Sequence, residues 1–158
     1  MVIGHDWGSY LAGRFALWYP ERLLGLVMMS VAYTPPSKVY VPLTDVVKLA
    51  PNYGYQLYFK DLKSSKQIPA HLDRFIDLIF GKPNKSLNFT PKGAMERILT
   101  DTQPLEVDTI LDAETKAIYL RELGKGMHGP LNYYRTSQER HEEEKSMKRV
   151  RSCPLNPR

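Results

Sequence analysis

The sequence predicts an α/β protein that opens with a parallel β-α-β unit and continues as an all-helical segment. Two apolar segments flank a helical pattern near the amino terminus, a glycine-bounded turn separates the first segment from the helix, and later residues lack a strand signal. The 158 residues can bury a sizeable core, because one domain takes roughly 100 to 200 residues.

The β-α-β unit occupies residues 1–34. Val2 and Ile3 form the short apolar opening, residues 4–8 the turn, residues 9–19 the helical pattern, and residues 24–31 the second apolar run. The second run is continuously apolar, which is typical of a parallel strand covered on both faces. Since such crossovers are almost always right-handed, we expect that hand here.

Residues 35–135 are expected to form a separate helical segment. The spacing of apolar residues and of Pro, Gly and Asn breakers predicts helices over residues 44–50, 52–60, 69–80, 91–100, 112–124 and 130–140. Asp112 is the expected N-cap of the fifth helix, and Gly81 the stop of the third. Residues 136–158 are charged, and we expect them to form a solvated helix end followed by a disordered tail.

Composition excludes several classes of protein. Lys and Arg outnumber Asp and Glu by 22 to 17, but the basic residues are scattered, which argues against a nucleic-acid partner. The single cysteine, Cys153, excludes a disulfide framework and cysteine-rich zinc sites and fits a reducing compartment. Since no apolar run approaches the roughly 20 residues of a membrane span, we expect a soluble, cytoplasmic protein.

The chemistry is concentrated in the hexapeptide GHDWGS, residues 4–9, at the strand-to-helix turn. A sharp turn of this kind holds its central residue in a strained conformation, and small neighbours let strand and helix approach closely. Asp6 is therefore the candidate nucleophile, and the Trp7 N–H the candidate oxyanion donor at the helix N-terminus. Two plainer interpretations remain: Asp6 is an ordinary N-cap, and His5 is structural.

This turn resembles the nucleophile elbow of the α/β-hydrolase fold, with a carboxylate in place of the usual serine. A carboxylate attacks alkyl carbon and leaves an ester of the enzyme, which suits epoxides or haloalkanes as substrates. Residues 2–37 as a whole, including the YPER turn at residues 19–22, resemble the nucleophile strand, helix and next strand of the epoxide hydrolase family. The resemblance implies a partial α/β-hydrolase core, residues 1–34, followed by a helical cap, residues 35–135.

The resemblance also implies two catalytic tyrosines in the cap. Residues 52–59, NYGYQLYF, are similar to one cap motif of the family and place its tyrosine at Tyr55. Residues 130–135, PLNYYR, are similar to the other and place its tyrosine at Tyr134. A phenol can protonate an opening epoxide without carrying charge into an apolar cavity, whereas a haloalkane dehalogenase needs no such acid.

The family's base and its acidic partner find no counterpart in the sequence. His71, His128 and His141 are better interpreted as surface or structural histidines, and the family's first strands would precede Met1. The expected function is epoxide hydrolysis to vicinal diols through an Asp6 ester, with epoxide and water as partners and no cofactor or metal. The chain looks truncated, and the alternatives are a haloalkane dehalogenase-type hydrolase and a non-catalytic fragment or interaction module.

Overall fold

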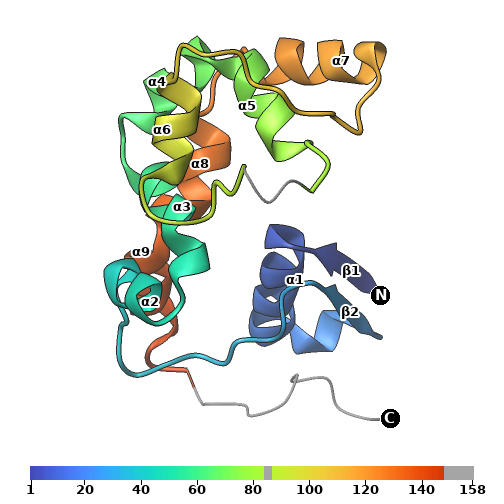
Figure 1. The fold of residues 1–158 in the computed structure, drawn as a ribbon. Helices are drawn as coiled ribbons and strands as arrows, with labels where there is room; N and C mark the ends of the chain where they lie inside the picture. Colours follow the sequence, from blue (N-terminus) through green and yellow to red (C-terminus); the bar gives the residue numbers. More distant parts are fainter. Residues whose placement is uncertain (84–86, 148–158) are drawn as a thin grey trace. The chain divides into compact units, whose positions relative to one another are not determined.

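A computed structural model describes residues 1–83 and 87–147 of the protein (Figure 1). The chain divides into two compact units, one formed by Met1–Tyr40 with the segment from Gln138 onward, the other by Val41–Ser137. We call them the strand unit and the helical unit. Within the described ranges, no helix combines the length and apolar character needed to cross a membrane.

The strand unit begins with the predicted β-α-β arrangement. Strand β1, Val2–His5, leads into helix α1, Trp7–Trp18, and after the short 3₁₀ helix η1, Pro20–Arg22, strand β2 follows at Leu26–Met29. The strands pair in parallel, with Val2 opposite Leu26 and His5 opposite Met29, and α1 packs against both (Figure 1). The predicted parallel β-α-β unit followed by helices is confirmed.

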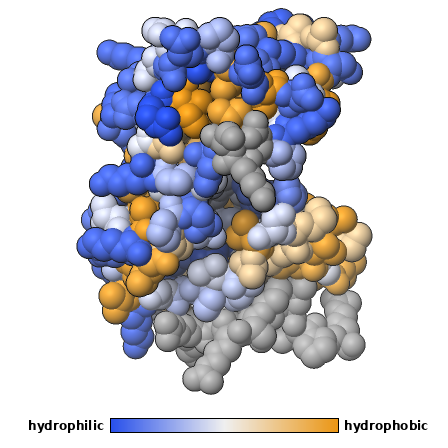
Figure 2. Space-filling view, in the orientation of Figure 1, coloured by the Kyte–Doolittle hydropathy of each residue, from blue (hydrophilic) through white to orange (hydrophobic). Residues whose placement is uncertain are grey.

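Strand β2 is shorter and more exposed than the sequence suggests. Its burial alternates along the strand, with Val27 and Met29 exposed, and Ile3 on β1 is exposed as well. The described residues form a sheet of only two strands, so the expectation of cover on both faces is wrong for this chain. Figure 2 shows the resulting apolar surface over the strands.

The carboxyl-terminal helix α9, Ser137–Glu144, completes the strand unit from Gln138 onward. Glu144 is buried and accepts a 2.7 Å hydrogen bond from Arg14 Nη1 on α1, forming an ion pair with it. Helix α9 lies where the sequence predicts a helix end, but Glu144 is buried in it rather than solvated. Cys153 and the residues after Met147 lie outside the described ranges.

The helical unit has the larger core. Its elements are α2 (Leu43–Leu49), η2 (Pro51–Tyr53), α3 (Gly54–Lys60), α4 (Ser64–Ala70), α5 (Leu72–Ile79), α6 (Ala94–Thr100), α7 (Ala113–Leu123) and α8 (His128–Arg135). Aromatic and aliphatic side chains from most of these helices form one buried cluster: Tyr58, Phe59, Ile68, Phe75, Ile76, Leu78, Met95, Ile98, Leu99, Met127 and Leu131. Asp112 caps α7 as predicted, accepting a hydrogen bond from the Thr115 N–H at 2.7 Å.

Two predicted helices are divided in the structure. Of the helix predicted over residues 69–80, the first two residues belong to α4, which runs through Pro69 to its C-cap His71, where the backbone leaves the helical region. The remainder forms α5. The helix predicted over residues 130–140 ends at Arg135. There Thr136 donates from both its N–H and its hydroxyl to the Asn132 carbonyl, which terminates α8 before α9 begins.

Candidate active site

The candidate nucleophile lies at the junction of β1 and α1. Asp6 has φ 52° and ψ −121°, and among the described non-glycine residues only Asp6 and Ser30 have positive φ. A carboxylic acid residue in this region of backbone space is strained and persists only where its surroundings hold it. The Asp6 residue is exposed to solvent.

Gly4 and Ser9 hold the turn together. A Cβ atom on Gly4 would lie 2.2 Å from the carbonyl oxygen of Gly8 and 2.6 Å from the Ser9 nitrogen, so any larger residue would force strand and helix apart. Ser9 is fully buried, and its hydroxyl donates to the Val31 carbonyl at 2.7 Å. Gly8 does not share this role, since a Cβ there would meet nothing within 4 Å. The expectation that Gly8 permits a close approach is therefore wrong.

Trp7 contacts the Asp6 carboxylate through its backbone. Its N–H donates to Asp6 Oδ2 at 2.6 Å, so the carboxylate also serves as the N-cap of α1. The indole packs edge-on against Tyr10, with ring centroids 5.5 Å apart, and the Arg140 guanidinium lies 5.5 Å from the indole centroid. The N-cap and nucleophile interpretations thus describe one geometry, in which the helix N-terminus faces the carboxylate.

The two candidate proton donors lie together in the helical unit. Tyr55 on α3 and Tyr134 on α8 have ring centroids 6.4 Å apart in an edge-to-face arrangement, and both residues are half-buried. Phe59 lies against both rings, at 5.5 Å from Tyr55 and 4.9 Å from Tyr134. Gln56 Nε2 donates to the Tyr55 hydroxyl at 3.3 Å.

The structure therefore groups the predicted site residues in two pairs. Asp6 and Trp7 are neighbours in the strand unit, and Tyr55 and Tyr134 are neighbours in the helical unit. Phe59, a member of the buried cluster, contacts both tyrosines and was not among the predicted site residues. Its spacing of four residues from Tyr55 on a helix is the signal that predicts their contact.

The four histidines are exposed or half-buried. His5 on β1, His71 between α4 and α5, and His128 at the start of α8 are all exposed, while His141 lies beside the Tyr40 ring at 5.4 Å. His128 Nδ1 is 3.4 Å from Arg135 Nη1. In the ranges that the structure describes, no group of three or more His, Cys, Asp or Glu residues is arranged to hold a metal ion.

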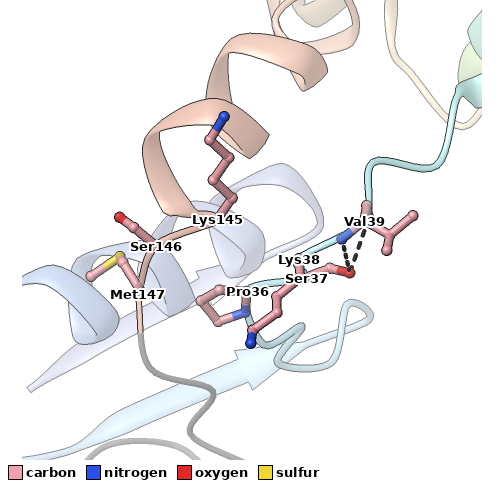
Figure 3. A pocket seen from close by; sticks show the side chains of 7 residues that line it. All are labelled: Pro36, Ser37, Lys38, Val39, Lys145, Ser146 and Met147. Carbon is pink, nitrogen blue, oxygen red and sulfur yellow. Dashed lines mark hydrogen bonds between the residues drawn. The ribbon is translucent and has the colours of Figure 1, made fainter.

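A surface hollow in the strand unit is lined by residues other than the candidate site residues. It is lined by Pro36, Ser37, Lys38, Val39, Lys145, Ser146 and Met147 (Figure 3). The Ser37 hydroxyl donates to the Val39 carbonyl at 3.0 Å and lies 3.3 Å from the Val39 nitrogen, so this serine is engaged with its own loop. The lining includes two lysines but none of the candidate site residues.

Comparison with known proteins places the chain beside epoxide hydrolases, although no family model matches it. It is 29% identical over 142 residues to bifunctional epoxide hydrolase 2 of Sus scrofa, covering 87% of this chain and 25% of that protein. It is also 29% identical over 152 residues to the epoxide hydrolase srdG of Neurospora crassa, covering 89% of this chain and 43% of that protein.

Solved structures agree with the sequence comparison. Epoxide hydrolase A from Mycobacterium thermoresistibile superposes with a TM-score of 0.65 at 25% identity, covering 89% of this chain and 46% of that one. An epoxide hydrolase from Vigna radiata, with a TM-score of 0.63 at 21% identity, shares the fold over 89% of this chain and 45% of its own. The chain thus spans less than half the length of these relatives. It is related in sequence to epoxide hydrolases and has part of their α/β-hydrolase fold.

Proposed function

We propose that this chain carries the nucleophile and the proton donors of an epoxide hydrolase. The observation that carries the proposal is the pairing of Tyr55 and Tyr134. Their ring centroids lie 6.4 Å apart, although the two residues are near opposite ends of the helical unit's sequence. Two adjacent phenols suit the developing alkoxide of an epoxide, since both can donate to one oxygen. The similarity to epoxide hydrolases supports the same reaction.

The first step forms an ester at Asp6. A carboxylate oxygen of Asp6 attacks one epoxide carbon, the bond from that carbon to the ring oxygen breaks, and the oxygen takes a proton from Tyr55 or Tyr134. The product is a hydroxyalkyl ester of Asp6. The strained backbone at Asp6 supports this role because it presents the carboxylate outside the packed β1–α1 junction.

The second step releases the diol. Water adds to the ester carbonyl carbon, and the resulting oxyanion accepts a hydrogen bond from the Trp7 N–H. Collapse expels the diol and restores the Asp6 carboxylate, and the proton that ester hydrolysis releases returns to the tyrosine that was deprotonated in the first step. The 2.6 Å bond from Trp7 N to Asp6 Oδ2 supports this role, since the donor already faces that carboxyl group. Activation of the water needs a base, which we do not assign to any histidine of this chain.

Trapping of the ester tests the proposal. We expect the protein incubated with styrene oxide to gain the mass of one epoxide, located at Asp6 by peptide mapping. Asp6→Ala should abolish the adduct, whereas Asp108→Ala, at a side chain 85% exposed, should keep it. Absence of an adduct at Asp6 contradicts the proposal, and halide release from a chloroalkane with no epoxide adduct favours the dehalogenase alternative.

The tyrosines have their own test. Replacing both Tyr55 and Tyr134 by Phe removes the proton donors. Ester formation should therefore slow by roughly 10²- to 10⁴-fold, the rate enhancement that general acid catalysis usually provides. Tyr53→Phe is the matched control, because this exposed residue lies just outside the pair. An ester-formation rate unchanged in the double variant would remove the tyrosines from the mechanism.

A further inference from the structure

Arg135 ends helix α8 next to Tyr134 and faces the same side of that helix. Leu131, Tyr134 and Arg135 stand at positions i, i+3 and i+4, the spacing of one helical face. Leu131 is 2% exposed and belongs to the core cluster, and Tyr134 packs against that cluster. Arg135 itself is half-buried, and its guanidinium contacts the segment between α3 and α4.

The Arg135 guanidinium forms hydrogen bonds with the corner between α3 and α4, residues 61–65. Its Nη2 donates to the Asp61 carbonyl at 3.1 Å, to Ser64 Oγ at 3.1 Å and to Ser65 Oγ at 2.8 Å. Asp61 is the C-cap of α3, so the cation sits at the end of the helix where unsatisfied carbonyls and the negative pole of the dipole lie. Arg135 thus caps the helix that carries Tyr55.

Ser64 extends this contact toward the aromatic cluster. It is fully buried, and its Oγ lies 2.7 Å from the Asp61 carbonyl oxygen and 3.3 Å from that of Phe59. Phe59 is the residue whose ring meets both Tyr55 and Tyr134. A continuous set of hydrogen bonds therefore joins Arg135 to the backbone beneath this ring.

We propose that Arg135 is a positioning residue that holds Tyr134 against Tyr55 by fastening the end of α8 to the end of α3. The effect of Arg135 on catalysis rests on the proposed function, but the contact between the Tyr55 and Tyr134 rings can be measured without substrate. The two N–H groups of Arg135 Nη2 are shared among the three neutral oxygens. A lysine would keep the charge and the N–H donors on a flexible stem without the fixed guanidinium plane, so we expect it to hold the two helix ends together less well.

Ring contacts observed by NMR test the proposal. In protein with labelled aromatic rings, we expect Arg135→Gln to lose the NOEs of Tyr134 to Tyr55 and Phe59. The Phe80–Tyr119 contact, with centroids 4.7 Å apart in the same unit, should persist as an internal reference. Arg121→Gln, at an exposed arginine on α7, is the matched control for the lost charge and should change neither set.

Ser65→Ala keeps the test decisive if Arg135→Gln unfolds and loses both sets of NOEs. It removes only the 2.8 Å acceptor and should weaken the tyrosine contacts while leaving the reference contact intact. Arg135→Lys should restore part of what Arg135→Gln loses. If Arg135→Gln folds and its tyrosine contacts are unchanged, the proposal is overturned. If Arg135→Gln is unfolded, unchanged tyrosine contacts in Ser65→Ala overturn it instead.

Reactivity toward styrene oxide separates this inference from the proposed function. If the wild-type protein forms no Asp6 adduct but the NOE result holds, epoxide hydrolysis fails and the fastening of α8 stands. If the adduct forms, Arg135→Gln should slow it, and combining Arg135→Gln with Tyr134→Phe should slow it no further than Tyr134→Phe alone. Fully additive losses would overturn the positioning role.

Discussion

Gly4 is the residue on which the geometry of the elbow depends. A Cβ at this position would stand 2.2 Å from a backbone oxygen, which cannot move aside as a side chain can. We expect Gly4→Ala to lower the free energy of unfolding by about 3 kcal/mol through overpacking, as measured by urea denaturation. It should also abolish the Asp6 adduct, because strand and helix would part at the nucleophile.

Gly8→Ala is the natural control for Gly4→Ala. Both glycines flank Asp6 in the same hexapeptide, but a Cβ on Gly8 meets open space and lies in the first turn of α1. Alanine there should stabilise the helix by about 0.5 kcal/mol, since glycine is a poor helix former. Equal losses from the two substitutions would contradict the close approach assigned to Gly4.

Tyr58 gives the protein a pH-dependent stability in the alkaline range. Burial, reinforced by the negative charges of Glu96 and Asp61, raises its pKa from the usual 10.0 to about 12. Because the folded state favours the protonated phenol, this contribution is complete below about pH 10 and is lost as the pH rises toward 12. By linkage the loss approaches roughly 2–3 kcal/mol.

Tyr58→Phe isolates that contribution. Among the described residues the Tyr58 hydroxyl has no hydrogen-bond partner, so its removal should leave stability near neutral pH unchanged or slightly improved. Urea denaturation at pH 8 and pH 11.5 should show a smaller decline for the variant than for the wild type. Parallel declines would mean that other groups account for the alkaline loss.

At the scale of elements, a buried ion pair joins α1 to α9 in the strand unit. Arg14 and Glu144 are buried, and the guanidinium also lies 4.9 Å from the Tyr10 ring centroid. We expect Glu144→Gln to lower the free energy of unfolding by about 3 kcal/mol, because it leaves a buried cation without its counter-charge. Urea denaturation followed by Trp fluorescence measures the change.

The neighbouring Glu143 provides the control for Glu144. It has the same charge and lies in the same helix, but it is exposed. Glu143→Gln should change stability by less than about 0.5 kcal/mol, as surface substitutions usually do. A similar small effect at both positions would show that α9 is not fastened through this pair.

Elements with a strong local signal could be predicted from the sequence. Apolar periodicity located β1, α1 and β2, and a side-chain cap located the start of α7 at Asp112. Helix α4 escaped prediction because it is short, polar at its start and contains Pro69. The contacts of Arg135 with Ser65 and of Arg14 with Glu144 could not be predicted either, since these partners lie 70 or more residues away along the chain.

At the scale of the whole molecule, the two units have cores of very different size. The strand unit buries small or medium apolar side chains such as Ala12, Ala16 and Leu17, whereas the helical unit buries a large cluster that includes Phe59 and Phe75. Stabilisation by apolar burial grows with the area removed from water, at about 25 cal/mol per Å². The helical unit should therefore be the more stable of the two.

Two optical probes can follow the units separately. Both tryptophans, Trp7 and Trp18, lie in the strand unit, while helices α2 through α8 lie in the other, so fluorescence reports the first and far-UV circular dichroism mainly the second. We expect the fluorescence transition at lower urea than the dichroism transition, which a two-state protein does not show. Trp18→Phe, at a residue 45% exposed, leaves Trp7 as sole reporter and should preserve the difference. Coincident transitions would instead mean that the elbow and the tyrosine pair share one cooperative fold.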